Sequence, residues 1–488
     1  VQSAGRLGLS LRQAALSRRE ALGETIGVPA WNAEALKTLA QDRYHPLFIA
    51  WPTTTELDDV AAARYALSPD EIASLGFAVA HRIDPAPPVE GLSEAMVEAA
   101  ETIATALMAA ERPLVVSGGS LASEPVLEAA GNVARALSRR AKRGGLALIR
   151  REANSTGLSL MGGQRVPRQT VDAALAPAEI CVVLDHQRTA TAERANFLLS
   201  AASFAEADGT LVNLEGRAQR FFQVYDPSYM RPESRIHESW RWLHALAVNL
   251  QGEKAGDITL DTVIAACVEA HPELSGMEEA APASHYRIDG LQLAREPHRY
   301  SGRTSMRANQ NVSEPRVPQD PDSAFAYSME GYSGYHEPRQ QVPFAWAPGW
   351  NSPQAWNKFT DEVGGHLRGG DPGVRLMRPV PGQGHYSRPP QRAEGVESGE
   401  RSPALRALIL PRLFGGEETS SLATPIQKRT QTPSVTLSRE DAEHFSVRGG
   451  DTVTILGETL SVVQQDGWPK GWIGLPAGLF SGLLPGEP

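Results

Sequence analysis

Residues 113–141 read PLVVSGGSLASEPVLEAAGNVARALSRRA, which is an apolar run, a glycine turn and a helical pattern in direct succession. An apolar run that ends in glycine predicts a strand, and the residues after Glu124 show the three- and four-residue apolar spacing of a helix. Ser120 or Ser123 is the expected N-cap, because a short hydroxyl side chain accepts from the first free N–H groups of a helix. The stretch therefore predicts a strand–turn–helix unit.

Two further apolar runs continue this alternation. LALIR at 146–150 and EICVVLD at 179–185 are predicted to be buried strands. Strands that alternate with helices favour a parallel sheet covered by helices on both faces, so the predicted fold class is α/β. Gly118-Gly119 resembles a phosphate-binding turn only loosely, because SGGSLAS lacks the G-x-G-x-x-G spacing, and the chain has no Walker motif. An ordinary strand-to-helix turn is favoured there.

The regions on either side are predicted to be largely helical. Residues 1–112 carry helical periodicity, interrupted by a short buried strand in HPLFIAW at 45–51. Downstream, SWRWLHALAVNL at 239–250 and ITLDTVIAACVEAHPEL at 258–274 predict two more helices.

The last part of the chain has a β pattern. Residues 401–488 contain short apolar runs separated by Gly and Asp turns, which predict a small β domain. Within it, SREDAEHF predicts a short helix with Ser438 as its cap and Asp441 in its first turn.

The region between the helices and the β domain is irregular in pattern. Residues 281–400 are rich in Pro, Gly and Arg, and the part from 381 to 402 is predicted to be a linker. The stretch 343–363 nevertheless carries Trp346, Trp350 and Trp356, which are costly to leave in water. We expect an extended segment held against the domain or against a partner.

Composition limits the function classes. Hydrophobic residues make up 41% of the 488 residues and charged residues 21%, which is typical of a globular protein in water. No apolar run reaches the roughly 18 residues of a membrane span, so direct membrane insertion is not expected. A net charge of −10 argues against binding to nucleic acid, and a salt-bridged loop is the favoured interpretation of the basic residues at 295–307.

Cysteine usage excludes several metal sites. The chain has two cysteines, Cys181 and Cys267, and no C-x-x-C pair. Neither a disulfide framework nor a cluster held by four thiolates is therefore expected in it, and a reducing compartment is indicated. The chain begins at Val1 without an initiator Met or a secretory signal pattern, so we expect a piece of a longer protein.

The most informative polar stretch is FAEADGTLVNLEGRAQRFFQVYDP at 204–227. Its glycines, Gly209 and Gly216, suit tight bends with positive φ, and Arg217 is placed to form a bidentate pair with Glu206 or Glu215. We expect an ordered loop that makes specific contacts. Elsewhere, His186 and Arg188 follow a predicted strand, where the favoured role is hydrogen bonding within the adjoining loop.

These motifs resemble a known family. EADGT-x-VN-x-EGRAQ is similar to a loop of the molybdopterin oxidoreductase superfamily, and RFFQVYDP followed by ESWRWLH resembles one branch of it, the G subunit of bacterial NADH:quinone oxidoreductase (respiratory complex I). The chain resembles the C-terminal part of that subunit, from about Trp31 to the end. The resemblance is most specific in a few stretches, namely 183–188, 204–227, 238–244, 294–309 and 343–363.

The resemblance implies a fold and a division into domains. It implies a molybdopterin-oxidoreductase-like parallel-sheet module, of the formate dehydrogenase and DMSO reductase type, and a C-terminal domain like a double-psi β-barrel. The expected division is an incomplete α/β module at 1–250, a helix with the irregular segment and linker at 251–400, and the barrel at 401–488. At Gly162-Gly163 the chain joins places that the family separates by a further strand and helix.

It also implies a function without catalytic residues in this segment. The chain is expected to be a structural and assembly part of the peripheral arm, with other peripheral-arm subunits as partners, on the cytoplasmic side of the bacterial inner membrane. Electrons from NADH to quinone would pass through [4Fe-4S] and [2Fe-2S] clusters in an N-terminal part of the family subunit, which this sequence lacks. No metal ligand or catalytic residue is predicted.

The alternative hypothesis is an active molybdopterin-dependent oxidoreductase, like formate dehydrogenase. Neither Cys181 in a strand nor Cys267 on an apolar helix face is placed like a metal ligand. A generic hydrolase is disfavoured because the chain has no G-x-S-x-G elbow and no H-E-x-x-H run. The residues that would hydrogen-bond a pterin under the alternative lie in the 204–227 stretch: Glu206, Asp208, Asn213, Glu215 and Arg217.

Overall fold

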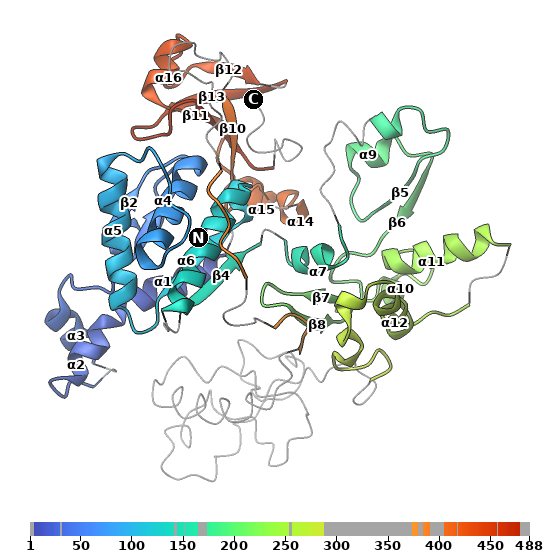
Figure 1. Cartoon of the computed structure of the whole chain (residues 1–488). Coiled ribbons are helices and arrows are strands. Elements are labelled where there is room, and N and C mark those ends of the chain that lie inside the picture. Colours follow the sequence, from blue (N-terminus) through green and yellow to red (C-terminus); the bar gives the residue numbers. More distant parts are fainter. Residues whose placement is uncertain are drawn as a thin grey trace, which may run out of the picture. The chain divides into compact units, whose positions relative to one another are not determined.

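The chain forms an α/β protein whose described residues fall into two compact units (Figure 1). Unit 1 comprises 1–155, 164–178 and 379–488, and unit 2 comprises 156–163 and 179–378. The computed structural model describes residues 4–29, 32–140, 144–150, 152–163, 173–252, 256–286, 373–378, 384–390, 405–416, 418–455 and 457–478. The predictions for 294–309 and 343–363 lie outside these ranges, and the three-part domain division stays a prediction.

Unit 1 begins with the helices and short strands predicted for its N-terminal part. Strand β1 (Phe48–Ala50) lies inside the predicted 45–51 run and pairs in parallel with β2 (Ala63–Tyr65), which confirms the prediction of a strand. The helices before and after this pair are α1 (Gly5–Leu16), α2 (Arg18–Glu24), α3 (Ala33–Ala40), α4 (Pro69–Ile83) and α5 (Glu94–Ala109).

Helix α4 begins at a capping box. The Ser68 hydroxyl accepts from the Glu71 backbone N–H, and the Glu71 carboxylate accepts from the Ser68 N–H at 2.8 Å. Pro69 occupies the first turn, where its missing N–H leaves nothing unsatisfied. This start sets the register that turns Phe77 and Ala80, both fully buried, toward the core.

Helix α6 (Glu124–Arg139) is the central helix of unit 1 and packs beside α4, which in turn packs against α5 (Figure 1). Ala136 and Leu137 of α6 are fully buried. Ser123 stands at the N-cap as predicted, but its side chain makes no capping hydrogen bond. Pro125 in the first turn already lacks an N–H, so fewer donors need a cap there.

The predicted strands exist, but their burial was predicted wrongly. β3 (Leu114–Gly118) pairs in parallel with β4 (Gly145–Ile149), and in unit 2 β5 (Val182–Asp185) pairs in parallel with β6 (Phe197–Ser200). Each is a two-stranded sheet among the described residues. Leu114 is 47% exposed and Val182 is 42% exposed. Within the described part of the chain no second layer covers these exposed side chains, whereas a large parallel sheet is covered on both faces.

The C-terminal part of unit 1 is a five-stranded mixed sheet in the order β10-β14-β11-β13-β12. Its helix α16 (Arg439–His444) is capped by Ser438, whose hydroxyl accepts from the Asp441 N–H at 3.0 Å, which confirms the prediction. The double-psi form of the barrel stays a prediction. The other elements are β10 (Arg406–Leu410), α14 (Glu418–Ser421), α15 (Thr424–Gln427), β11 (Ser434–Leu437), β12 (Thr452–Ile455), β13 (Glu458–Gln464) and β14 (Trp472–Pro476).

A shared apolar cluster joins this sheet to the N-terminal part of unit 1. Leu408, Trp468 and Trp472 pack with Leu121, which follows β3, and with the partly buried Ile72 of α4. The Trp468 indole N–H donates to the Trp472 carbonyl at 2.8 Å, so the buried ring leaves no polar atom unpaired. The two parts of unit 1 therefore share this cluster, in addition to the core that each part has of its own.

Unit 2 is built around a small antiparallel sheet in the order β7-β8-β9, with helices beside it. The predicted helices at 239–250 and 258–274 are confirmed as α11 (Ser239–Leu250) and α12 (Leu260–Ala270). Leu260 and Ile264 of α12 share a core with the sheet residues Val212 and Ala218. The remaining elements are α7 (Ser155–Leu160), α9 (Ala190–Glu193), β7 (Gly209–Val212), β8 (Arg217–Phe221), α10 (Pro227–Met230) and β9 (Val374–Arg375).

Two glycines in the α4–α6 pair test how closely these helices pack. A Cβ at Gly76 of α4 would lie 2.9 Å from the Ala129 Cβ of α6, whereas a Cβ at Gly131 meets nothing within 4 Å. We expect Gly76→Ala to lower the free energy of unfolding by about 1–3 kcal/mol through overpacking. Gly131→Ala is expected to raise it by about 1 kcal/mol through helix propensity. Urea unfolding of both variants measures this, and equal effects would contradict the close packing.

Candidate functional site

The 204–227 stretch, predicted to be an ordered loop, contains a β-hairpin formed by β7 and β8. β7 pairs with β8 in antiparallel register, with Thr210 opposite Arg220 and Val212 opposite Ala218. The short β9 then pairs with the other edge of β8, with Val374 opposite Ala218. The polar residues predicted as a site therefore lie on one turn and on the flanks of a three-stranded sheet.

Asn213 organises the hairpin turn. Its Oδ1 accepts from the backbone N–H of Glu215 at 2.9 Å and from that of Arg217 at 3.0 Å. Gly216 has φ +73°, which confirms the prediction of a positive φ, and a Cβ there would lie 2.5 Å from the Met377 Cβ. The Asn213 side chain thus closes the turn, and both of these hydrogen bonds lie within the turn.

Arg217 stabilises the same turn, but not through the predicted bidentate pair. Its Nε lies 3.1 Å from Glu215 Oε2, and its Nη1 donates to the Gly373 carbonyl at 3.4 Å. Glu206 is not its partner, because the Glu206 carboxylate accepts from the Ser203 N–H at 3.0 Å. One guanidinium therefore ties the turn to the residue that precedes β9.

Asp208 holds the open end of the hairpin. Its carboxylate accepts from the Gln223 backbone N–H, and its carbonyl accepts from the Trp240 indole N–H at 3.3 Å. Gly209 was predicted at a positive φ, which is wrong, since it lies in the extended strand β7. Glycine is needed there because a Cβ would lie 2.3 Å from the Phe221 ring.

The structure reveals an ion pair between a buried arginine and a half-buried aspartate that sequence reasoning missed. The side chain of Arg220 on β8 is 2% exposed, and its Nη2 lies 2.7 Å from Oδ1 of Asp261 in the first turn of α12. The other carboxylate oxygen of Asp261 accepts from the Ser284 N–H at 2.9 Å and from the Ser284 hydroxyl at 2.7 Å. Side chains alternate along the strand RAQRF, so Arg217 and Arg220 lie on opposite faces of the sheet. This alternation was the sequence signal that could have separated the roles of the two arginines.

The ion pair changes the acidity of Asp261. Burial of the carboxyl works to raise its pKa, but the hydrogen bonds from Ser284 and Arg220 outweigh burial, and the pKa of Asp261 lies below its ordinary value. Thr210, opposite Arg220 in the register, has a buried hydroxyl without a hydrogen-bond partner in the part of the chain that the structure describes. The hairpin and α12 thus enclose a small polar cluster.

The remaining predicted residues lie apart from the hairpin turn. His186 Nδ1 lies 3.6 Å from Asp185, and Arg188, whose side chain is 83% exposed, lies 3.4 Å from Glu193. Both contacts are local, as the favoured interpretation predicted. Cys181 precedes β5, and its N–H donates to Asn196 at 2.7 Å.

Cys267 is a poor metal ligand for a chemical reason. It lies on α12 among the apolar residues of the unit 2 core, and burial raises the pKa of its thiol. A metal binds the thiolate, so a raised pKa opposes ligation. Within the described ranges, no group of three or more His, Cys, Asp or Glu side chains is arranged to hold a metal ion.

The turn between β3 and α6 is covered by the C-terminal part of unit 1. Leu121 in this turn is buried against Leu408 and Trp472, and a Cβ at Gly118 would lie 2.4 Å from the Ile149 carbonyl oxygen. The turn is therefore covered on the side of Leu121, whereas Gly119 is exposed and a Cβ there would meet nothing within 4 Å.

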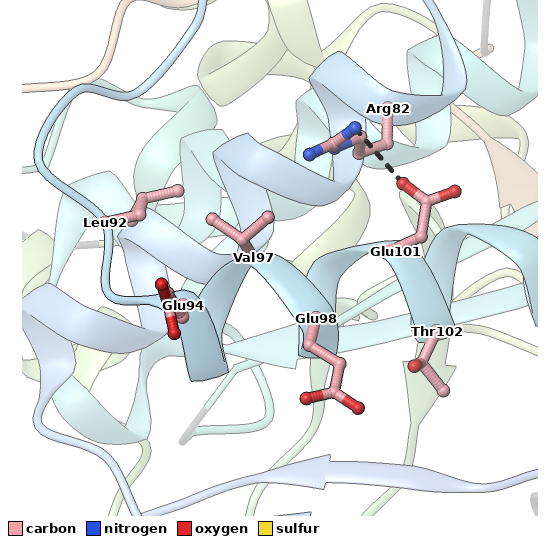
Figure 2. A pocket seen from close by; sticks show the side chains of 7 residues that line it. All are labelled: Arg82, Leu92, Glu94, Val97, Glu98, Glu101 and Thr102. Atoms are coloured by element: carbon pink, nitrogen blue, oxygen red, sulfur yellow. Dashed lines mark ion pairs between the residues drawn. The ribbon is translucent and has the colours of Figure 1, made fainter.

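A shallow hollow on unit 1 contains none of the predicted site residues. Its volume is about 400 Å³, and Figure 2 shows Arg82 of α4 reaching toward Glu101 of α5, with which it forms an ion pair at 3.2 Å. Its lining residues are Arg82, Leu92, Glu94, Val97, Glu98, Glu101 and Thr102. Arg82, the cation in this lining, is already paired.

Comparison with known proteins gives consistent matches. The family model "Molybdopterin oxidoreductase" matches residues 90–237. The NADH-quinone oxidoreductase G subunit of Pseudomonas putida is 47% identical over an alignment of 524 positions, which covers 100% of this chain and 58% of that protein. The G subunits of Shewanella oneidensis and Escherichia coli K12 are 44% and 43% identical, over 99% of this chain and 56% of theirs. The chain thus spans a little over half the length of these curated relatives.

A solved structure was matched more weakly. Acetylene hydratase from Pelobacter acetylenicus aligns with a TM-score of 0.37 and 12% identity, over 91% of this chain and 68% of that one. No described helix is both long and apolar enough to cross a membrane.

The Asp261 ion pair predicts an acid-sensitive stability. Because the pKa of Asp261 is lower in the folded chain than in the unfolded one, its contribution is complete above the ordinary value of 3.8 and is lost as the pH falls through the folded value. We expect Asp261→Asn to lower the urea midpoint at pH 7 and to reduce its further fall below about pH 4. Asp257→Asn, an exposed neighbour, is the control. A parallel pH dependence in both variants would contradict the role of the pair.

Proposed function

This chain belongs to the family of the NADH-quinone oxidoreductase G subunit, and we propose that it is a structural and assembly part of that subunit in the peripheral arm of the enzyme. The enzyme as a whole is an oxidoreductase that passes electrons from NADH to quinone. In this proposal the electrons travel through [4Fe-4S] and [2Fe-2S] clusters outside the present chain. Identities of 42–47% to such subunits over 99–100% of the chain support the assignment.

The observation that carries the non-catalytic role is the bonding of the hairpin residues. Asn213, Glu206 and Asp208 direct side-chain acceptors to backbone N–H groups of their own hairpin or the residues beside it. Arg217 divides its donors between Glu215 and the Gly373 carbonyl. A pterin would compete with these hydrogen bonds, and each backbone group that lost its bond would need a new hydrogen-bond partner. The bonds that these five residues already make support a structural role for the hairpin over a pterin cradle, and no step is assigned to a pterin.

The proposal also covers partners and location. The chain would contact other peripheral-arm subunits and would lie on the cytoplasmic side of the bacterial inner membrane without inserting into it. Exposed apolar side chains on unit 2 support a role in contacts, since patches of this kind often mark protein interfaces. They include Phe204, Val224, Tyr229 and Met230, which are 61–84% exposed.

Metal and cofactor analysis of the purified enzyme that contains this subunit tests the non-catalytic role. We expect iron and acid-labile sulfide, but no stoichiometric molybdenum and no pterin released on denaturation. One molybdenum and one pterin per subunit would establish the alternative, an active molybdopterin-dependent oxidoreductase, and would overturn the proposal.

Arg217 tests the structural role of the hairpin. Arg217→Ala removes the bond to the Gly373 carbonyl and the contact with Glu215. We expect a loss of about 1–2 kcal/mol in unfolding free energy and a lower yield of assembled enzyme, with unchanged iron–sulfur signals per assembled enzyme. Arg188→Ala, which removes an exposed arginine paired only locally, is the matched control. Unchanged stability and assembly of Arg217→Ala would argue against the role.

A further inference from the structure

Residues 384–390, GHYSRPP, lie in the stretch predicted to be a linker, yet they are docked on helix α6. Three polar residues of α6 face this segment: Asn132, Arg135 and Arg139. Their spacing of three and four residues puts them on one side of the helix. A chain segment more than 240 residues away in sequence is thus held by a continuous row of side chains.

Asn132 recognises the backbone of the segment. Its Nδ2 donates to the Ser387 carbonyl at 2.8 Å, and its Oδ1 accepts from the Ser387 N–H at 3.0 Å. Arg135 Nη1 also donates to this Oδ1 at 3.2 Å, which is consistent with the orientation of the amide. One side chain satisfies both backbone groups of Ser387, as a neighbouring β-strand would.

Asn132 is fully buried with the segment in place, next to the apolar residues Val133 and Ala136. An amide that leaves water without a hydrogen-bond partner is strongly unfavourable. The bonds to Ser387 supply these partners, so the segment covers Asn132 without leaving its amide unpaired.

Tyr386 supplies the side-chain contact. Its hydroxyl donates to Asp84 Oδ2 at 2.6 Å, and the Asp84 carboxylate also lies 3.3 Å from Arg140 Nε. The Arg139 guanidinium lies 4.4 Å from the centre of the Tyr386 ring. Burial and the neighbouring Asp84 raise the pKa of Tyr386 to about 12, which is consistent with a protonated phenol that donates to a carboxylate.

Gly384 completes the match. It has φ +107°, which side chains rarely adopt, and a Cβ there would lie 3.0 Å from Arg135 Nη2. Its carbonyl accepts from Arg139 Nη2 at 3.4 Å. The helices therefore contact Gly384, the side chain of Tyr386 and the backbone of Ser387. Pro389 and Pro390, which follow Arg388, favour an extended chain.

We propose that the surface formed by the end of α4 and by α6 is a binding site for an extended peptide segment, that Gly384–Pro390 is its ligand, and that this clasp fastens the chain before the C-terminal sheet to these helices. The site favours tyrosine at 386 through Asp84 and Arg139, and at 387 it binds the backbone. The inference goes beyond the proposed function and does not depend on it, since it concerns contacts inside one chain.

Chymotrypsin tests the clasp in the full chain, because it cuts after Tyr386 only when the backbone on both sides is released. We expect slow cleavage at Tyr386–Ser387 in the wild type. Asn132→Ala and Tyr386→Phe should each accelerate cleavage by about tenfold or more, since one loses both backbone bonds and the other the bond to Asp84. Phenylalanine remains a chymotrypsin site, so the second variant keeps the readout.

Two matched variants should leave the cleavage rate unchanged. Ser387→Ala keeps the backbone that Asn132 binds, and Asn249→Ala removes an amide that bonds only within α11, to the Ala245 carbonyl. Urea unfolding of each variant shows whether the global fold persists under the cleavage conditions. Tyr386→Phe changes no helix, so it decides the question if Asn132→Ala does not fold.

The outcomes separate the clasp from the proposed function. Wild-type cleavage at Tyr386 as fast as in the urea-unfolded chain overturns the clasp, as does acceleration by Ser387→Ala equal to that by Tyr386→Phe. Neither result depends on molybdenum content or on assembly of the enzyme, so either proposal can fail while the other stands.

Discussion

The contact between helices α4 and α6 is the one on which the rest of unit 1 depends. It is close enough that Gly76 leaves no room for a methyl group beside Ala129. From that contact α6 presents one face to the α4–α5 core, lies against β3 and β4, and holds the clasp through Asn132 and its neighbours. A shift of α6 would therefore disturb the core, the small parallel sheet and the clasp together.

The hairpin at 204–227 is the stretch whose polar residues most suggested a ligand site, and its hydrogen bonds support the structural role proposed for it. Its polar residues suit a ligand site by type and density, yet they bond to their own backbone and to the residues beside β9. A hairpin with a positive-φ glycine and a side-chain-closed turn places strict demands on sequence. Those demands are enough to account for Asn213, Gly216 and Arg217 in structural terms.

The C-terminal sheet and the clasp stabilise unit 1 from different positions. Leu408, Trp468 and Trp472 cover the β3–α6 turn, while Arg406 lies over the Trp472 ring at 4.1 Å and pairs with Asp70 at the start of α4. The clasp contacts α6 further along the helix. Both attachments join parts of the chain that are distant in sequence, which suits a chain whose proposed role is to hold other parts of an enzyme in place.

The sequence by itself determined what is set by local backbone preference and by periodicity. Strand β3, helices α11 and α12 and the Ser438 cap follow from the residues within each element. Other features were decided only by the tertiary structure: the exposure of Leu114, the Arg220–Asp261 pair, the bond from Arg217 to Gly373 and the docking of 384–390. The physical reason is that these features depend on residues that are distant in sequence, and the local sequence around each residue does not indicate which distant residues will contact or cover it. The composition of 384–390 predicts a linker, and only the tertiary structure shows that Asn132 binds the backbone of this segment.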